Sequence, residues 1–149
     1  MVIVALLVAW ATAISWSDWT RRRIPNAALL LMLIPETLAL ITQGQGLLGE
    51  AWLSSVVGMA IGFVLTLPGY LLRRLGAGDV KFAAVASLLL GAPRGFEMVL
   101  GGSLLMGVAA LVALSRHLPR QTRFPAAPML AAAFVVEMLA GPLLPVWRR

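Results

Sequence analysis

The sequence contains no cysteine and a single histidine. The lack of cysteine excludes disulfides, thiolate metal sites and cysteine nucleophiles. The single histidine, His117, has no HExxH motif around it, so the parts of a zinc hydrolase or of a serine–histidine catalytic system are missing. We therefore expect His117 to be a solvated loop residue, and we expect no metal site.

Charged residues are also scarce. They make up 12% of the chain and hydrophobic residues 60%, with a mean hydropathy of +0.92, whereas a soluble domain carries about 25% charged residues. This composition predicts an integral membrane protein. The net charge of +6 could indicate nucleic acid, but the basic residues stand in short clusters between apolar runs and not along one amphipathic face. We interpret them as topology signals, with membrane lipid and no nucleic acid as a partner.

Six apolar runs approach the roughly 20 residues that a helix needs to cross a bilayer. They cover residues 1–17, 27–42, 51–72, 80–92, 96–115 and 124–146. The fourth run is short, so we expect either that its neighbours bury it or that the preceding turn extends it. No linker, low-complexity tract or soluble domain is left over, so residues 1–149 are predicted to form one all-α, polytopic membrane bundle.

The distribution of basic residues indicates the orientation of this bundle. Residues 1–17 carry no charge and the arginines follow them, which is the reverse of a cleaved signal peptide, so we expect a retained helix that starts outside. With residues 21–23 in the cytoplasm, alternation of the spans places an excess of basic residues on that side. Those residues are Arg21, Arg22, Arg23, Arg73, Arg74, Lys81, Arg116, Arg120 and Arg123. The sequence thus predicts about six transmembrane helices in the inner (cytoplasmic) membrane, with both termini external.

Glycines within the spans predict close helix packing. Gly58 and Gly62 form a GxxxG pair in the third run, and Gly101, Gly102 and Gly107 occur in the fifth. Small residues let helix backbones approach where lipid provides no hydrophobic drive for association. We attribute these glycines to packing and not to function.

Four of the six acidic residues are glutamates. Glu50 and Glu97 fall at the external ends of spans, where we expect water to solvate them. Glu36 and Glu137 fall near mid-depth, where an ionised carboxylate is costly. A proton path is one interpretation of this pair; the other is a protonated glutamate hydrogen-bonded across the bundle, and Pro35 leaves a backbone carbonyl that Glu36 could meet.

The two aspartates fall at the same predicted membrane edge. Asp18 ends the first span and Asp79 opens the fourth, and the topology places both on the cytoplasmic side. Two carboxylates in a partly dehydrated site cannot both ionise cheaply, so they share one proton and titrate in two separate steps. The ionised member can deprotonate a water molecule while the protonated member hydrogen-bonds a peptide carbonyl. This is the chemistry of aspartic proteolysis.

Simpler roles exist for both aspartates. Asp18 could pair with Arg21 or Arg22 one turn along the helix. Asp79 could be the N-cap of the helix over residues 80–90.

Two motifs around the aspartates resemble those of a known family. Residues 18–26, DWTRRRIPN, fit the pattern D-x5-I-P-N, and residues 76–81, GAGDVK, fit G-x-G-D-x-K. Both patterns are typical of the type IV prepilin peptidases, which are GxGD membrane aspartyl proteases, and residues 124–128 are similar to the proline-containing start of that family's last helix. The resemblance implies that residues 1–149 are a single transmembrane peptidase domain in which Asp18 and Asp79 are catalytic.

Other motif residues are expected to bind substrate or to shape the site. The fixed φ of Pro25 suits the first turn of the second helix and forces a sharp re-entry next to the first aspartate. Asn26 ends the same motif. Gly76 and Gly78 can supply the turn before the fourth span, permit positive φ and let a substrate backbone pass close to the second aspartate. Lys81 either favours ionisation of a nearby carboxylate or extends to lipid phosphates.

The resemblance implies an endopeptidase that cleaves the leader from prepilin or pseudopilin precursors without a cofactor. Longer relatives carry a cysteine-bearing cytoplasmic domain after the first helix and N-methylate the pilin. Here only a short loop separates the first two spans, so the chain resembles the short, peptidase-only branch that serves Flp (Tad) pili. The alternative is a non-enzymatic transporter or pilus-assembly subunit in which the aspartates are structural, although no clear internal repeat supports it.

Overall fold

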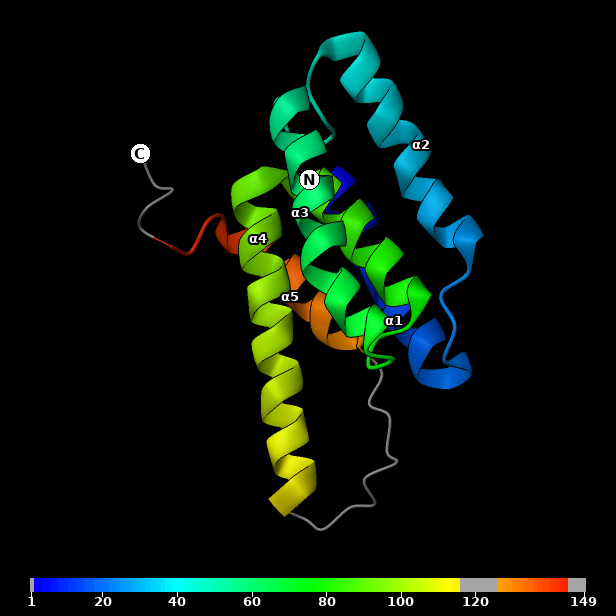
Figure 1. The fold of residues 1–149 in the computed structure, drawn as a ribbon. Helices are drawn as coiled ribbons and strands as arrows, with labels where there is room; N and C mark the ends of the chain where they lie inside the picture. Colours follow the sequence, from blue (N-terminus) through cyan, green and yellow to red (C-terminus); the bar gives the residue numbers. More distant parts are fainter. Residues whose placement is uncertain (1, 116–125, 145–149) are drawn as a thin grey trace.

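The computed structural model describes residues 2–115 and 126–144, and these form five α-helices (Figure 1). The helices are α1 (Val2–Arg21), α2 (Asn26–Gln43), α3 (Trp52–Leu71), α4 (Ala77–Ser115) and α5 (Ala127–Ala140). No strand occurs in these two stretches. The predicted all-α fold is therefore confirmed for the part of the chain that the structure describes.

Four of these helices, α1 to α4, are long and apolar enough to cross a membrane, and α5 is shorter, with 14 residues. A multi-pass membrane protein is thus supported. That six segments cross the bilayer and that both termini are external stay predictions. His117, and the basic residues predicted for the cytoplasmic loop between residues 116 and 123, lie outside the described residues.

Helix α4 contains the fourth and fifth predicted spans, folded back on each other at Gly91 (Figure 1). Gly91 has φ 78° and ψ 174°, which is not helical. The Ser87 hydroxyl donates a hydrogen bond to the carbonyl of Gly95 at 3.5 Å, whereas a straight helix would separate these residues by about 12 Å. The chain therefore reverses within α4 and forms a helical hairpin.

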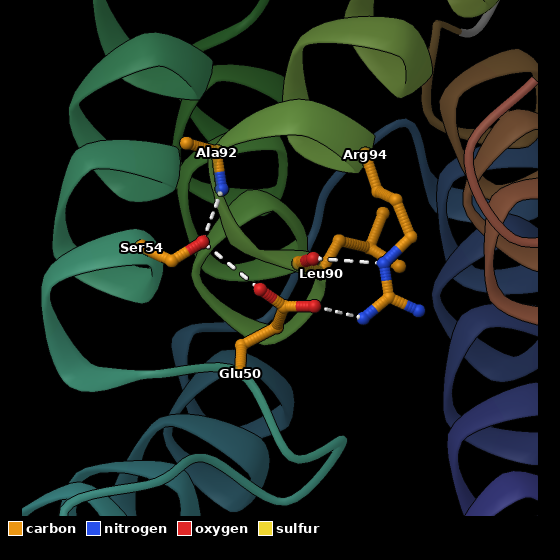
Figure 2. Close-up of polar contacts among 5 residues, drawn as sticks. All are labelled: Glu50, Ser54, Leu90, Ala92 and Arg94. Atoms are coloured by element: carbon orange, nitrogen blue, oxygen red, sulfur yellow. Dashed lines mark hydrogen bonds and ion pairs between the residues drawn. The ribbon is translucent and has the colours of Figure 1, made fainter. Parts of the chain in front are cut away.

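A polar network surrounds this reversal (Figure 2). Glu50 pairs with Arg94 at 2.6 Å and accepts a hydrogen bond from the Ser54 hydroxyl at 2.9 Å. The Ser54 oxygen accepts the amide of Ala92 at 3.2 Å, and the Arg94 Nε donates to the carbonyl of Leu90 at 3.1 Å. The expectation that Glu50 is simply solvated by water is wrong, because it provides an ionic and hydrogen-bonded link from the start of α3 to both sides of the reversal.

Glycines let α3 pack closely against α4. A Cβ added at Gly58 would collide with the backbone carbonyl oxygen of Ser87, and one added at Gly62 would lie 2.5 Å from the carbonyl oxygen of Ala83. The predicted packing role of this GxxxG pair is confirmed. Gly107 differs, because an added Cβ there would meet no described atom within 4 Å.

The first half of α4 forms the centre of the bundle. Phe82 and Leu89 are fully buried, and the Trp10 ring lies 5.4 Å from the Phe82 ring and 5.9 Å from the Phe134 ring. These rings join α1, α4 and α5. Both explanations for the short fourth run are therefore confirmed. Its neighbours bury it, so it has no need to match the thickness of the lipid, and the preceding turn extends it, since the helix begins at Ala77.

Glu36 has an unexpected partner. Its side chain is fully buried, and Oε2 accepts the amide of Leu47 at 2.9 Å, in the connection between α2 and α3. The expected contact with the backbone carbonyl freed by Pro35 is not the one observed, because the carboxyl oxygen accepts a hydrogen bond from a loop amide instead. Glu36 thus fixes the loop to the side of α2.

Glu97 is buried, so the expectation that water solvates it is wrong. It is 4% exposed, and its two oxygens accept the amides of Leu143 at 2.6 Å and Leu144 at 3.1 Å. The chain after α5 therefore turns back onto α4 and covers this carboxylate. Glu137 is also buried, and its Oε2 has no hydrogen-bond partner among the described residues.

Candidate active site

Asp18 lies in the last turn of α1, with its side chain 7% exposed. Its backbone carbonyl accepts the amide of Arg22 at 2.9 Å, and Arg22 ends the helix with a positive φ of 51°. Its side-chain Oδ2 accepts the amide of Ala127 at 3.3 Å. Within the described residues no arginine lies within 4.0 Å of this carboxylate, so no direct ion pair holds Asp18, although the nearby charge of Arg22 acts on it.

Asp79 lies in the first turn of α4, which begins at Ala77. The expectation that Asp79 is the N-cap is therefore wrong. Its Oδ2 instead reaches back and accepts the amide of Gly76 at 2.9 Å, as the third residue does in a capping box. Its Oδ1 is buried and has no hydrogen-bond partner among the described residues, so one oxygen stabilises the helix start and the other is free.

Both carboxylates line one cavity of about 280 Å³. They are close enough for their charges to interact. The other residues that line the cavity are Arg22, Arg23, Ile24, Gly76, Ala77 and Gly78. Since one water takes about 30 Å³ in the liquid, this space can hold water and a short stretch of extended peptide beside the two acids.

The N-terminus of α5 also faces the pair. The Ala127 amide, the first of α5, donates to Asp18 and is also oriented toward Asp79. Unpaired amides at a helix start carry partial positive charge, which favours a nearby carboxylate. The sequence does not single out this donor, because every residue except proline has a backbone N–H group. The proline-containing start of the last helix was the available signal, and its residues 124 and 125 lie outside the described residues.

The two motif glycines are required for space and not for backbone conformation. Neither Gly76 nor Gly78 has a positive φ, so that expectation is wrong. A Cβ at Gly78 would lie 3.0 Å from the Cβ of Ile24, and a Cβ at Gly76 would lie 3.2 Å from Oδ2 of Asp79. Gly78 therefore lets the loop after α1 and the start of α4 approach each other, whereas Gly76 leaves room for the Asp79 carboxylate.

Pro25, Asn26 and Lys81 connect the two motifs. Pro25 is extended, with φ −69° and ψ 131°, and it precedes α2 as its N-cap instead of lying in the first turn. Asn26 begins the helix, and its Oδ1 accepts a hydrogen bond from Lys81 Nζ at 3.2 Å. Lys81 is not within 4.0 Å of either carboxylate. Its observed contact therefore links α2 to α4, and none of these three residues lines the cavity that holds the aspartates.

The arrangement is suited to acid–base chemistry on a peptide bond. Two carboxyl groups share a cavity, one oxygen is free, and an amide orients the other acid. Such a pair can bind a water molecule, remove its proton and donate a hydrogen bond to a carbonyl. No group of three or more metal-ligating side chains is close enough to hold a metal ion within residues 2–115 and 126–144.

Comparisons with curated proteins and with solved structures give no match. The profile of the type IV leader peptidase family matches residues 5–111. This is more than half of the chain, and it contains both aspartates, both motifs and the hairpin of α4. The chain belongs to the type IV leader peptidase family.

Proposed function

We propose that this protein is a membrane aspartic endopeptidase that removes the leader peptide of Flp-type prepilin-like precursors at the cytoplasmic face of the inner membrane. Family membership supports a leader-peptidase-like protease. The observation that carries the assignment to Asp18 and Asp79 is their shared cavity, in which Asp79 Oδ1 is buried and unpartnered.

In this proposal the two carboxyl groups share one proton. The ionised group takes a proton from a water molecule, whose oxygen attacks the carbonyl carbon of the scissile peptide bond. The protonated group hydrogen-bonds the carbonyl oxygen as negative charge develops there. The tetrahedral species then collapses, the C–N bond breaks, and the departing amine receives a proton from the pair.

The rim of the cavity favours a particular substrate charge. Arg22 and Arg23 both line it, and the Ser17 hydroxyl fixes the second of them by donating to its backbone carbonyl at 3.0 Å. A basic rim attracts an acidic side chain close to the cleavage point. Only residues 22–25 separate α1 from α2, which supports a peptidase without the N-methyltransferase activity of longer relatives.

The transport alternative has less support. Glu36 contacts the loop between α2 and α3, whereas Glu137 lies on α5 beside Glu97. The two glutamates thus belong to different contacts, and neither lines the cavity that holds the aspartates.

The test is co-expression with a prepilin precursor of the Flp type. We expect the wild-type protein to shift the precursor to the mature size on a gel, and Asp18→Asn and Asp79→Asn to leave it unprocessed while remaining in the membrane at normal levels. Full processing by the Asp79→Asn protein would refute the catalytic pair. No shift with any precursor in the wild type would favour a non-enzymatic role.

A further inference from the structure

A groove runs along the outside of the bundle between α1 and α5. Two overlapping cavities of about 270 and 450 Å³ form it, and both are lined by Thr12, Ser15 and Pro128. On α1 the groove extends from Val8 to Trp19. These residues are eleven positions apart, which is about 16 Å along a helix.

Most of the side chains that line the groove are small or apolar. Ala11 and Ala131 form buried parts of its floor. The Thr12 hydroxyl donates to the carbonyl of Val8 at 2.8 Å, and the Ser15 hydroxyl donates to the carbonyl of Ala11 at 2.9 Å. Because both hydroxyl protons are used within α1, the groove is suited to an apolar occupant and not to a polar chain.

One end of the groove lies at the candidate active site. Pro128 directly follows Ala127, whose amide is bonded to Asp18, and Trp19 directly follows Asp18 on α1. The groove length of about 16 Å corresponds to about half of the 30 Å hydrocarbon layer. An apolar helix of about three turns lying here would therefore have one end next to the two carboxylates.

We propose that this groove binds the apolar helix of the substrate, the segment that follows the scissile bond. The proposal rests on the proposed function and assigns a docking surface to it. Small residues on α1 and α5 let a third backbone approach closely, which is how helices associate in lipid. A second apolar cavity, between α4 and α5, includes Glu137 and Leu143 and so lies toward the other end of α5, away from the aspartates.

The first experiment narrows the groove by placing a large side chain in it. Thr12 is exposed and lines both cavities of the groove but not the second apolar cavity, and Ala13 is exposed on α1 and lines none of them. We expect Thr12→Phe to slow processing of a full precursor about tenfold, equivalent to about 1.4 kcal/mol, and Ala13→Phe to leave it unchanged. Both variants should accumulate in the membrane like the wild type. Equal processing by the two variants would overturn the groove assignment.

The second experiment identifies the occupant directly. A photo-reactive amino acid is placed at position 12 or at position 13 of the Asp79→Asn protein, which is expected to hold the precursor uncleaved. We expect cross-links from position 12 to the apolar helix of the precursor and none from position 13. Cross-links only to lipid or to a second copy of this chain would overturn the proposal. Failure of the proposed function itself is distinguishable, because the unmodified wild type would then not process the precursor.

Discussion

Asp79 combines a structural and a proposed chemical role in one carboxyl group. Its Oδ2 accepts the amide of Gly76 and stabilises the first turn of α4, while Oδ1 is buried without a partner. An amide side chain can keep the first role, since its oxygen still accepts a hydrogen bond, but it cannot exchange a proton as a carboxyl group does. Substitutions at this position can therefore separate folding from catalysis.

We predict that Asp79→Asn lowers processing at least about a hundredfold, because general acid–base catalysis contributes that much or more. The melting temperature of the purified protein in detergent should stay close to that of the wild type. Asp79→Ala should lose activity equally and also lose about 1 kcal/mol of stability, the usual cost of removing a capping side chain. An Ala variant as stable as the Asn variant and the wild type would show that the Gly76 contact is unimportant.

Gly78 provides a second test of the candidate site at the scale of single residues. An added Cβ would lie 3.0 Å from the Cβ of Ile24, closer than ordinary van der Waals contact, so the loop after α1 must move. We predict that Gly78→Ala reduces processing about tenfold or more, since small displacements of catalytic groups are costly. Gly107→Ala is the matched control, because no described atom lies within 4 Å of its added Cβ. Similar activities of the two variants would contradict this role of Gly78.

At the scale of single elements, the reversal within α4 decides which segments meet. Its pivot, Gly91, adopts a combination of φ and ψ that is essentially restricted to glycine. Glu50, Ser54 and Arg94 then hold the two sides of the reversal to the start of α3. Because the first half of α4 is buried, its direction determines where Asp79 lies.

We predict that Gly91→Ala destabilises the protein by about 1–3 kcal/mol through backbone strain. An added Cβ would also lie 2.5 Å from the carboxylate oxygen Oε2 of Glu50 and disturb its network. The thermal midpoint in detergent should fall relative to the wild type. Gly101→Ala serves as control, since its Cβ would be 3.6 Å from that of Ala133, an ordinary contact. Equal midpoints for the two variants would show that the reversal tolerates a side chain.

The sequence predicted most helical segments and the motifs, and it was least informative about contacts between them. Apolar periodicity and length locate helices because the bilayer demands them. The burial of Glu97 was missed because its amide donors, at residues 143 and 144, become neighbours only after the chain turns back. The Ala127 amide was missed for a related reason: backbone donors are the same at every position.

At the scale of the whole molecule, the end of α1 and the starts of α4 and α5, which carry or contact the two aspartates, lie on the same side of the bundle (Figure 1). The connection between α2 and α3, around Gln45, lies at the opposite end. In the topology that we propose, the first side faces the cytoplasm and the second faces outward. The natural lack of cysteine makes this orientation simple to test.

We predict that single cysteines at two exposed positions label differently. Gln45→Cys should react with a membrane-impermeant thiol reagent in right-side-out vesicles, and Arg74→Cys should react only after the vesicles are opened. Both side chains are exposed, so accessibility within the protein is not limiting. The unsubstituted protein gives the background. Labelling of both positions from one side of sealed vesicles would invalidate the proposed topology.

The bond between Asp18 and Ala127 joins residues that are 109 positions apart. During synthesis, a ribosome completes the first helix long before it reaches the residue that supplies this amide. Partly translated chains therefore hold an aspartate without that partner, and the complete site requires docking of α5. Under the proposed function, proteolytic activity would thus arise only after α5 has been made, which would keep partly made chains inactive while they assemble.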